Sequence, residues 1–387
     1  MFKTVLQLIL FGAVACQLFY WIFIFSKLAF FEVKDNVVGT QNTPPDPKYL
    51  VRLDPSVSPV SVIICARNEA ANLTKNLPLI LNQEYPDFEV VVVNDASTDE
   101  TEQILNTFSQ QYKNLRVVHI TDKKILGKKG ALAAGIEAAH NDWLLLTDAD
   151  CYPSPEGGKP NKHWISSMVK GVNAKKIGLA YAPYAKRDGF LNTFIRFETV
   201  WTATQYMGFA LVGLPYMGVG RNMIYKKKLY EKAGGFQKHE HIASGDDDLF
   251  INSVISKNNF KIILQPETFM LSEPKTQWNA YFTQKKRHFS TATSYTLEHK
   301  IMLGMLSASH FSYFVTVVCL LALKISTIFV LVTIVVRTVV IWYIYGKILH
   351  KLRERNLFWW IPLLDVVYVL FYIVFLPTLT FRTQKWQ

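Results

Sequence analysis

Cysteine is scarce and scattered in this sequence. Among the 387 residues there are four cysteines and no CxxC pair; the four are Cys16, Cys65, Cys151 and Cys319. This pattern argues against a disulfide scaffold and against a cysteine-based zinc site. The sequence also has no GxxxxGK[ST] spacing, which excludes a Walker A loop. No internal repeat or low-complexity tract is present.

Charged residues are few as well, at 19% of the chain, whereas 50% of the residues are hydrophobic. Long uncharged runs must therefore exist. Residues 4–26 form the first of them, and at about 1.5 Å per residue they can cross a bilayer core of about 30 Å. No clean small-x-small cleavage site follows. We therefore expect an uncleaved N-terminal anchor, with a cleaved signal peptide as the alternative.

A second apolar block lies near the C-terminus and predicts three further transmembrane helices. Its three runs are residues 301–323, 325–346 and 358–381. A tight hairpin is expected near Lys324, and only Arg337 and Asp365 interrupt the last two runs. Because both charges fall at nearly the same depth and a lone charge in a bilayer is costly, we expect an ion pair between them. The alternative is that Arg337 snorkels to the head groups.

The loop between the last two runs predicts the orientation. Residues 347–356 carry four cations, Lys347, Lys351, Arg353 and Arg355. By the positive-inside rule this loop is cytoplasmic, and counting back through two spans places residues 27–300 in the cytoplasm too. We expect an integral protein of a bacterial inner (plasma) membrane.

One more uncharged stretch, residues 200–220, also needs interpretation. As a membrane span it would put the acidic motifs on its two sides into opposite compartments. It also carries Thr202, Thr204, Gln205 and Pro215. We expect a buried or membrane-grazing helix followed by a turn.

The middle of the chain alternates between strand-like and helix-like segments. A proline-rich stretch, residues 41–59, precedes it and reads as a linker. Short apolar runs then predict strands at 60–65, 88–93, 115–120 and 143–147, and helical spacing predicts helices at 70–81, 98–109 and 129–140. Strands separated by helices of this length are typical of a parallel sheet, in which ligands bind at the carboxyl ends of the strands.

Polar residues follow these strands where each of them ends. The first strand is followed by Ala66-Arg67-Asn68-Glu69, the second by Asn94-Asp95-Ala96-Ser97-Thr98-Asp99, and the fourth by Asp148-Ala149-Asp150. Any one of these groups could be a helix cap or a turn, and for Ser97 and Thr98 that is the favoured interpretation. The pair Asp148 and Asp150 suits Mg²⁺ or Mn²⁺, which take oxygen ligands and share them with substrate phosphates.

Three later motifs add charged groups to this edge. Gly127-Lys128-Lys129-Gly130 precedes a helix and can meet phosphate oxygens. Gly245-Asp246-Asp247-Asp248 opens the helical run 249–257, where acids favour the helix dipole but can also supply a general base. Gln284-Lys285-Lys286-Arg287-His288 lies just before the first C-terminal run and could be an ordinary juxtamembrane basic cluster.

Together these motifs resemble the membrane-bound family 2 glycosyltransferases, which include cellulose, chitin and hyaluronan synthases and ceramide glucosyltransferase. The resemblance covers roughly residues 58–290, in the expected order. Its segments are SVIICARNEA, VVVVNDASTDET, GKKGALAAGI, LLLTDAD, GVGRNMIYKK, SGDDDLFI and QKKRH, the last resembling QxxRW.

The resemblance implies a fold and a domain order. It implies an α/β, GT-A-like nucleotide-sugar-binding domain with a mostly parallel sheet, plus one N-terminal and about three C-terminal transmembrane helices. In chain order, the expected units are an anchor at 1–33, a linker at 34–58, the GT-A-like domain at 59–275, a membrane-interface segment with QxxRH at 276–300 and a C-terminal transmembrane bundle at 301–387.

It also implies roles for individual residues. Those implied for the nucleotide-sugar site are Ala66, Arg67, Glu69, Asp95, Lys128 and Asp148, with Lys128 approaching the diphosphate. Asp148 and Asp150 would hold the Mg²⁺ or Mn²⁺. The residues implied for catalysis are Asp247 as general base with Asp246 beside it, and Gln284 and Arg287 closing over the diphosphate.

Two departures from the family pattern bear on the product. His288 stands where QxxRW has Trp, and Ala133 stands where the family's GALN has Asn. That Trp lines the acceptor site in polymer-forming members. The interpretation is therefore a metal-dependent, inverting hexosyl- or N-acetylhexosaminyl-transferase that uses a nucleotide-sugar, expected to be UDP-linked, and a lipid or lipid-linked acceptor.

Three alternatives differ in class. The first is a processive polysaccharide synthase of the same superfamily, and the second is a non-catalytic membrane scaffold with a degenerate transferase domain. The net charge of +12 would also suit a nucleic-acid partner. However, the basic residues gather beside the apolar runs and the acids at the sheet edge, so we expect no nucleic acid.

Overall fold

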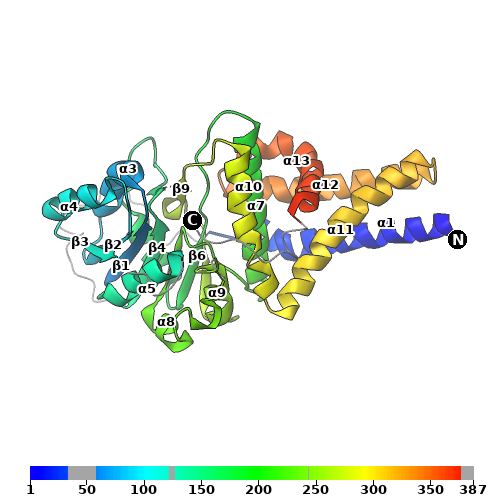
Figure 1. Ribbon diagram of the computed structural model, residues 1–387. Coiled ribbons are helices and arrows are strands. Elements are labelled where there is room, and N and C mark those ends of the chain that lie inside the picture. The colour runs from blue at the N-terminus through cyan, green and yellow to red at the C-terminus, as the bar shows by residue number, and fades with distance from the viewer. Residues whose placement is uncertain (34–57, 122–126, 243, 376–387) are drawn as a thin grey trace, which may run out of the picture.

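The computed structural model describes residues 1–33, 58–121, 127–242 and 244–375. The predicted linker at 34–58 lies outside these residues except for Ser58, and so does the part of the last apolar run beyond Phe375. Figure 1 shows an α/β body on one side and a set of long helices projecting from it on the other, with α7 and α10 crossing between the two parts.

The body is built on a seven-stranded, mostly parallel sheet. Its strand order is β3-β2-β1-β4-β7-β6-β8. The bounds are β1 Val60–Ala66, β2 Phe88–Asp95, β3 Leu115–Ile120, β4 Trp143–Asp148, β6 Ile177–Ala180, β7 Met223–Lys226 and β8 Phe260–Ile263. The first four strands in sequence pair in parallel, β7 is antiparallel to β4 and β6, and β6 pairs with β8 in parallel. The expected mostly parallel sheet is confirmed.

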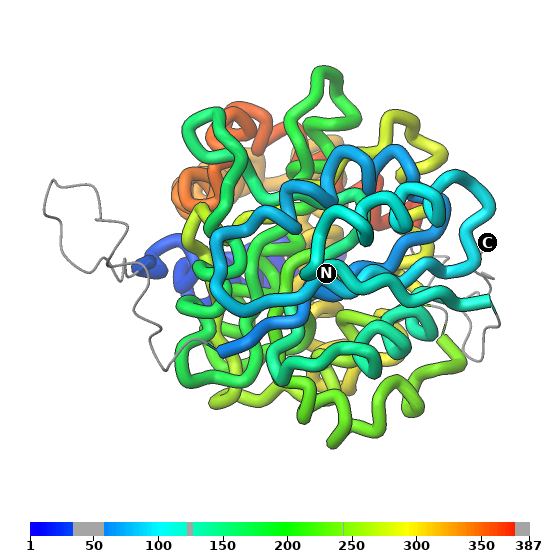
Figure 2. Tube along the Cα trace, turned by 90° about the vertical axis from the view of Figure 1, so that its left-hand side faces the viewer, coloured from blue at the N-terminus to red at the C-terminus, as the bar shows by residue number. Residues whose placement is uncertain are grey.

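Strands β1, β2 and β4 are largely apolar and buried because both faces of the sheet are covered there. In β2, for example, every residue from Val90 to Val93 is fully buried. The helices of the body are α3 Ala70–Leu81, α4 Thr101–Gln111, α5 Lys128–Ala138, α6 Trp164–Val172, α8 Lys227–Ala233 and α9 Asp248–Val254. A small second sheet consists of β5 Cys151–Pro153 and β9 Met270–Ser272. Figure 2 shows the parallel half of the sheet nearest the viewer and the C-terminal helices behind it.

Helices α7 (Phe190–Leu211) and α10 (Trp278–Phe289) lie where the body meets the projecting helices. The expectation of a buried helix in the 200–220 stretch is confirmed, although α7 begins ten residues earlier and ends at Leu211. Its Trp201 ring stacks on Trp21 of the N-terminal helix at 5.7 Å between ring centroids. Most side chains of α7 are therefore buried in packing contacts.

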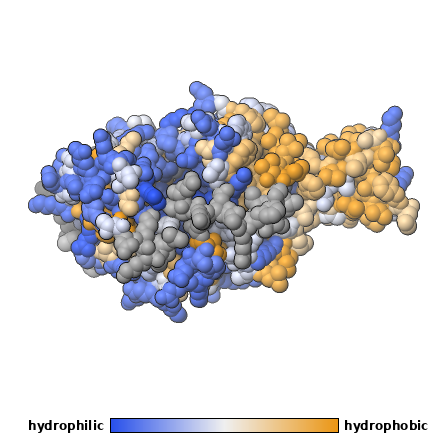
Figure 3. All heavy atoms as spheres, viewed as in Figure 1, coloured by the Kyte–Doolittle hydropathy of each residue, from blue (hydrophilic) through white to orange (hydrophobic). Residues whose placement is uncertain are grey.

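Within the described residues, four helical segments are long and apolar enough to cross a membrane, namely residues 2–29, 297–322, 327–351 and 355–375. They comprise α1 Phe2–Phe19, a π-helical turn at Tyr20–Phe25, α2 Ser26–Ala29, α11 Leu297–Ala322, α12 Thr327–Lys351, a 3-10 turn at Arg355–Trp360 and α13 Ile361–Phe375. Their outer surface is apolar, whereas the body is largely hydrophilic on the face shown in Figure 3. The tight hairpin near Lys324 is confirmed, because α11 ends at Ala322 and α12 begins at Thr327.

The predicted ion pair between the last two helices is also confirmed. The Nη1 atom of Arg337 on α12 lies 2.6 Å from Oδ2 of Asp365 on α13. Two further polar side chains complete the cluster. Gln17 of α1 accepts a hydrogen bond from Arg337 Nε at 2.8 Å, and His310 of α11 lies 2.9 Å from Asp365. The cluster thus joins all four helices.

Candidate active site

Three parallel strands end at one edge of the sheet and bring their last residues together. Ala66 at the end of β1 pairs with Asn94 on β2, and Cys65 pairs with Asp148 at the end of β4. This is the edge at which open α/β sheets bind ligands. The loops beyond β1 and β2 are joined by hydrogen bonds: Thr98 N–H donates to the Asn68 side chain, and Asn68 N–H donates to Ser97 Oγ. Ser97 and Thr98 therefore serve as turn residues.

A cavity of about 2000 Å³ opens from this edge and contains every predicted site residue. The predicted residues in its lining are Ala66, Arg67, Glu69, Asp95, Lys128, Asp148, Asp150, Asp246, Asp247, Gln284 and Arg287. They come from segments spread over more than two hundred positions of the sequence. The fold therefore assembles them in one place, while their roles stay predictions.

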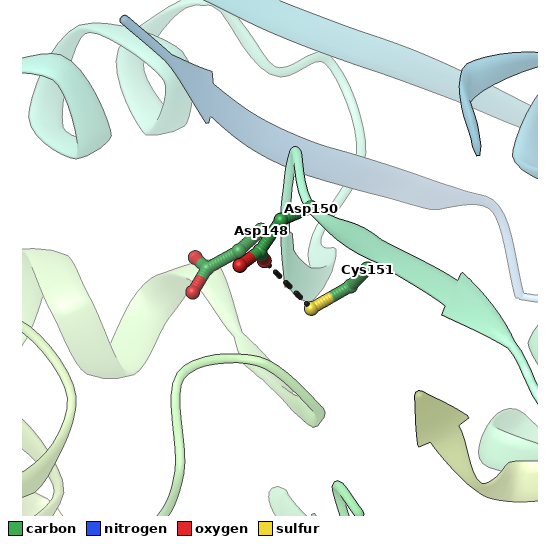
Figure 4. Close-up of side chains that lie close together, drawn as sticks. All are labelled: Asp148, Asp150 and Cys151. Carbon is green, nitrogen blue, oxygen red and sulfur yellow. Dashed lines mark hydrogen bonds between the residues drawn. The ribbon is translucent and has the colours of Figure 1, made fainter. Parts of the chain in front are cut away.

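Asp148 and Asp150 follow β4 and converge with Cys151, the first residue of β5 (Figure 4). One ligand atom from each of the three lies within 4.8 Å of the others. The Cys151 thiol donates a hydrogen bond to Asp150 Oδ1 at 3.3 Å, and burial raises its pKa well above the ordinary value. The thiol therefore stays protonated, and the two carboxylates are the ionic groups of the cluster.

This donor set fits a hard divalent cation. Burial, followed by the negative charge of Asp148, raises the pKa of Asp150. Two half-buried carboxylates that oppose each other's ionisation are stabilised by a bound cation, and oxygen donors are what Mg²⁺ and Mn²⁺ take. A softer site would need a thiolate, and the protonated Cys151 does not supply one.

The two lysines of the GKKG motif point to different places. Lys128 Nζ lies 2.5 Å from Asp148 Oδ1 and 3.3 Å from Asp246 Oδ2, so it bridges two acidic motifs inside the cavity. Burial would lower the pKa of Lys128, but these carboxylates hold it well above its usual value. Lys129 is fully buried and donates hydrogen bonds to the carbonyl oxygens of His239 and Ile242. It anchors the loop that leads to the aspartate triplet.

The three aspartates of the GDDD motif have distinct environments. Asp246 faces Lys128. Asp247 caps α9: its Oδ1 accepts from Asp248 N–H at 2.7 Å and its Oδ2 from Gly220 N–H at 2.8 Å. Asp248 Oδ2 accepts from the hydroxyls of Thr291 and Tyr295 at 2.5 and 2.7 Å. Asp248 thus holds the segment between α10 and α11.

The pKa of Asp247 lies near neutrality. Burial raises it, the negative charges of Asp246 and Asp248 raise it further, and it reaches about 7. A carboxylate near pH 7 can both accept and release a proton under physiological conditions, which is what general-base catalysis needs. Each of its oxygens holds one backbone N–H and keeps acceptor capacity for another hydrogen bond.

The QKKRH motif forms part of α10, which covers the cavity from the side of the projecting helices. Gln284 Nε2 lies 3.4 Å from the hydroxyl of Tyr184, and Arg287 and His288 also line the cavity. Burial, reinforced by the positive charges of Lys285 and Arg287, lowers the pKa of His288 well below its ordinary value. His288 is therefore a neutral imidazole where the family pattern has Trp.

Arg221 lines the cavity but was not singled out from the sequence. The guanidinium of Arg221 lies 4.3 Å from the centre of the Tyr184 ring and donates to the carbonyl of Ala182 at 3.0 Å. Its charge acts on both Asp148 and Asp150. The only signal was its place inside the GVGRNM segment, since the partner Tyr184 lies in an irregular stretch with no motif.

Two family models match the chain and together cover most of it. Glycosyl transferase family 2 matches residues 61–233, and Glycosyl transferase family group 2 matches residues 167–381. The chain belongs to the family 2 glycosyltransferases.

Individual relatives agree with this assignment. A Bacillus subtilis protein described as "Probable glycosyltransferase YdaM" is 27% identical over 240 residues, covering 59% of this chain and 54% of that protein. The beta-monoglucosyldiacylglycerol synthase of Nostoc sp. is 32% identical over 104 residues, covering 26% of this chain and 22% of that protein. The chain thus spans about half, or less, of the length of these relatives.

A solved structure supports the fold. The mannosyltransferase PcManGT of Pyrobaculum calidifontis, solved in complex with GDP-Man and Mn²⁺, superposes with a TM-score of 0.54 at 19% sequence identity. The superposition covers 95% of this chain and 97% of that one. The likeness therefore includes the projecting helices as well as the α/β body.

Proposed function

We propose that this protein is an inverting glycosyltransferase that moves a sugar from a nucleotide-sugar, expected to be UDP-linked, to a lipid or lipid-linked acceptor at the cytoplasmic face of a bacterial inner membrane. The observation that carries the proposal is the single cavity. It contains the predicted donor residues and Asp247, and it continues between helices that are apolar enough to cross a membrane.

The donor would lie along the carboxyl edge of the sheet. Ala66, Arg67, Glu69 and Asp95 would line the pocket of the nucleoside, and Lys128 would approach the diphosphate. Arg287 and Gln284 would close over the same diphosphate from α10. The negative charge of the leaving group grows as the glycosidic bond breaks, so fixed cations aimed at it stabilise the transition state.

Asp148 and Asp150 would hold a divalent cation, and such a cation, when bound, neutralises charge on the departing diphosphate. The structure of the neighbour PcManGT was solved in complex with GDP-Man and Mn²⁺. Within this chain, Lys128 and Arg221 add positive charge beside the same carboxylates.

Asp247 would start the transfer by accepting the proton of the acceptor hydroxyl. The acceptor oxygen then bonds to the anomeric carbon from the face opposite the nucleotide. The bond from that carbon to the diphosphate oxygen breaks, and its electron pair leaves with the nucleoside diphosphate. The configuration inverts, so an α-linked donor gives a β-linked product.

The test uses full-length protein in detergent, with a panel of UDP- and GDP-sugars and a lipid extract as acceptor. Release of nucleoside diphosphate together with a lipid whose mass increases by one sugar is the expected result. A ladder of many sugars would support the processive synthase instead. No nucleotide binding and no release in the presence of Mg²⁺ or Mn²⁺ would overturn the proposal in favour of a scaffold.

A further inference from the structure

The cavity does not end at the aspartates but continues between the projecting helices. One face of α11 lines this part, through Gly304, Ser307, Ala308 and Phe311. The spacing of these residues places them along one side of the helix. Residues of α13, including Ile373, line it from the other side. The donor edge and the membrane-level chamber are therefore one connected space.

This chamber opens sideways between α11 and α13. Phe311 is 40% exposed and Ile373 is 52% exposed although both line the cavity. A Cβ added at Gly304 would meet no atom within 4 Å among the described residues. An apolar opening between helices of this length faces lipid in a membrane, so an acyl chain can enter from the bilayer.

A polar stripe on α7 lines the same cavity. Glu198, Thr202 and Gln205 stand four and three residues apart, which places them on one face of α7. Thr202 Oγ1 lies 3.1 Å from Glu198 Oε1. Gln205 is half-buried, and its amide makes no hydrogen bond to any other described residue. Most of the remaining residues of the helix are buried in packing. This stripe together with Lys285 of α10 is called the head-group shelf below.

The shelf carries no net charge. Lys285 Nζ forms an ion pair with Glu198 Oε2, and the two side chains are 10% and 5% exposed. Most other cations of the cavity lie toward the donor edge: Lys128, Arg221, Arg287 and Lys275 act on Asp148 or Asp150, and Arg67 directly follows β1. Lys300 also lines the cavity but is exposed at the start of α11.

A paired carboxylate and ammonium with a free amide offers both acceptors and donors to hydroxyl groups. A phosphate would instead need a cation that is not already neutralised. Burying an ion pair costs desolvation free energy, and two apolar side chains could fill the same space without this cost. Packing alone therefore does not explain the Glu198–Lys285 pair.

We propose that the head-group shelf binds the head group of the acceptor lipid, and that this head group is uncharged and carries hydroxyl groups, as in diacylglycerol or a monoglycosyl diacylglycerol. The inference rests on the proposed glycosyl transfer and specifies its acceptor. The acyl chains would occupy the opening between α11 and α13, and the hydroxyl that reacts would point toward Asp247.

The test is photocrosslinking of the full-length protein in nanodiscs to a diacylglycerol that carries a diazirine on one acyl chain. We expect crosslinks within residues 303–311 and 368–375. Unlabelled diacylglycerol or monoglucosyl diacylglycerol should compete, and undecaprenyl phosphate at the same mole fraction should compete at least about tenfold less. Stronger competition by undecaprenyl phosphate, or crosslinks outside these helices, would overturn the inference.

Substitutions in the head-group shelf test whether crosslinking of the lipid depends on its side chains. Gln205→Leu and Thr202→Val should each weaken crosslinking about three- to tenfold, the range that loss of one hydrogen bond gives. Thr204→Val is the matched control on the same helix, because Thr204 is buried, bonds to the Val200 carbonyl and does not line the cavity. Equal losses in all three variants would contradict a binding role.

Glu198→Gln tests the charge argument, because it leaves Lys285 without its partner. Competition should then shift toward undecaprenyl phosphate. If this variant does not fold, the Gln205 and Thr202 variants decide alone. UDP and GDP binding, measured in parallel, should be unchanged in all variants. A wild-type protein that binds neither nucleotide refutes the proposed function, whereas nucleotide binding without competition by neutral lipids refutes only this inference.

Discussion

At the scale of single residues, Asp247 is both a structural residue and the proposed general base. It caps α9 through one oxygen and holds Gly220 N–H through the other, while burial and two neighbouring carboxylates raise its pKa to about 7. A base must be ionised before it can accept a proton. The rate of transfer should therefore fall about tenfold for each pH unit below 7 and level off above it.

Asp247→Asn should remove this pH dependence and lower turnover by about 10²- to 10⁴-fold, while nucleotide affinity stays the same. Turnover and UDP binding measured from pH 5.5 to 8.5 check this. If affinity falls in parallel with turnover, Asp247 is a binding residue and the assignment of the base is wrong.

The same substitution should affect stability with a definite sign. The pKa of Asp247 is higher in the folded protein than in the unfolded chain, so the folded state holds this proton more tightly. Its contribution to stability is therefore present at low pH and is lost as pH rises from about 4 to about 7. The Asn amide can accept only one of the two backbone N–H groups that Asp247 holds, so the variant loses one hydrogen bond at every pH. Its melting temperature relative to the wild type should nevertheless rise as pH goes from 5 to 8.

Asp150→Asn should abolish transfer and leave the fold intact. Its contacts in the structure are two weak acceptor contacts, from Cys151 Sγ and from Ser272 Oγ at 3.4 Å, and an amide oxygen can replace both. What the substitution removes is a charged oxygen ligand for the cation. Product formation over a Mn²⁺ titration, together with thermal melting, checks this. Turnover near the wild-type level without added metal would contradict it.

The sequence predicted which motifs gather at the edge of the sheet. It could not predict that neighbouring residues of one motif make different contacts. Lys128 and Lys129 are adjacent and chemically identical, yet one faces Asp148 and the other anchors a loop. Asp247 and Asp248 differ in the same way, because only the fold brings Thr291 and Tyr295 to Asp248. Such differences depend on long-range contacts, which spacing along the chain does not encode.

At the scale of elements, the strands that the sequence predicted are those of the parallel end of the sheet. The helix at 70–81 and the strand at 115–120 match α3 and β3 at both ends. These segments are long enough to show periodicity, and both faces of the sheet are covered. The strands β6, β7 and β8 have four residues each, too few for a pattern, and went unpredicted.

Close packing of α5 on the sheet gives a test at this scale. A Cβ at Gly135 would lie 2.8 Å from Ile63 Cγ2 and 2.9 Å from Val93 Cγ2, so α5 rests directly on β1 and β2. Gly135→Val should destabilise the protein by about 1–3 kcal/mol, because neither side chain can move away in the filled core. Thermal melting checks this against Gly12→Ala in α1, where no atom lies within 4 Å of the added Cβ. Equal melting temperatures for the two variants would show that α5 can shift.

At the scale of the whole molecule, the catalytic body is tied to the projecting helices at several buried points. Trp201 of α7 stacks on Trp21, and Arg196 of α7 forms a buried ion pair with Glu354 just beyond α12. Lys351 donates to the carbonyl of Phe31, which links α12 to the end of the N-terminal helix. Two of these ties hold α7, whose Thr199, Trp201 and Thr202 line the cavity, against the projecting helices. The anchor thus contributes to the geometry of the site.

The polar cluster inside the helices belongs to this scale because it joins all four of them. Arg337 is 3% exposed and contacts Asp365 with two nitrogens, at 2.6 and 3.3 Å. Removing one partner of a buried ion pair leaves an uncompensated charge, which costs about 3–5 kcal/mol, whereas replacing both with apolar residues can be nearly neutral. Arg337→Leu and Asp365→Leu should each lower the yield in detergent and the melting temperature.

The double variant decides whether the pair acts as a unit. With both charges gone, Gln17 Oε1 and His310 lose these partners, while Gln17 Nε2 still donates to the Ser309 carbonyl. The remaining cost is that of polar groups and not of a charge. Arg337→Leu combined with Asp365→Leu should therefore recover much of the loss in melting temperature seen in either single variant. Additive damage would show that the two charges do not depend on each other. Adding Gln17→Leu to the double variant should then cost only about 0.5–1.5 kcal/mol, because the one hydrogen bond it still removes is the one that Gln17 Nε2 donates to the Ser309 carbonyl. A further large drop would mean that Gln17 fixes the anchor to the bundle independently of Arg337.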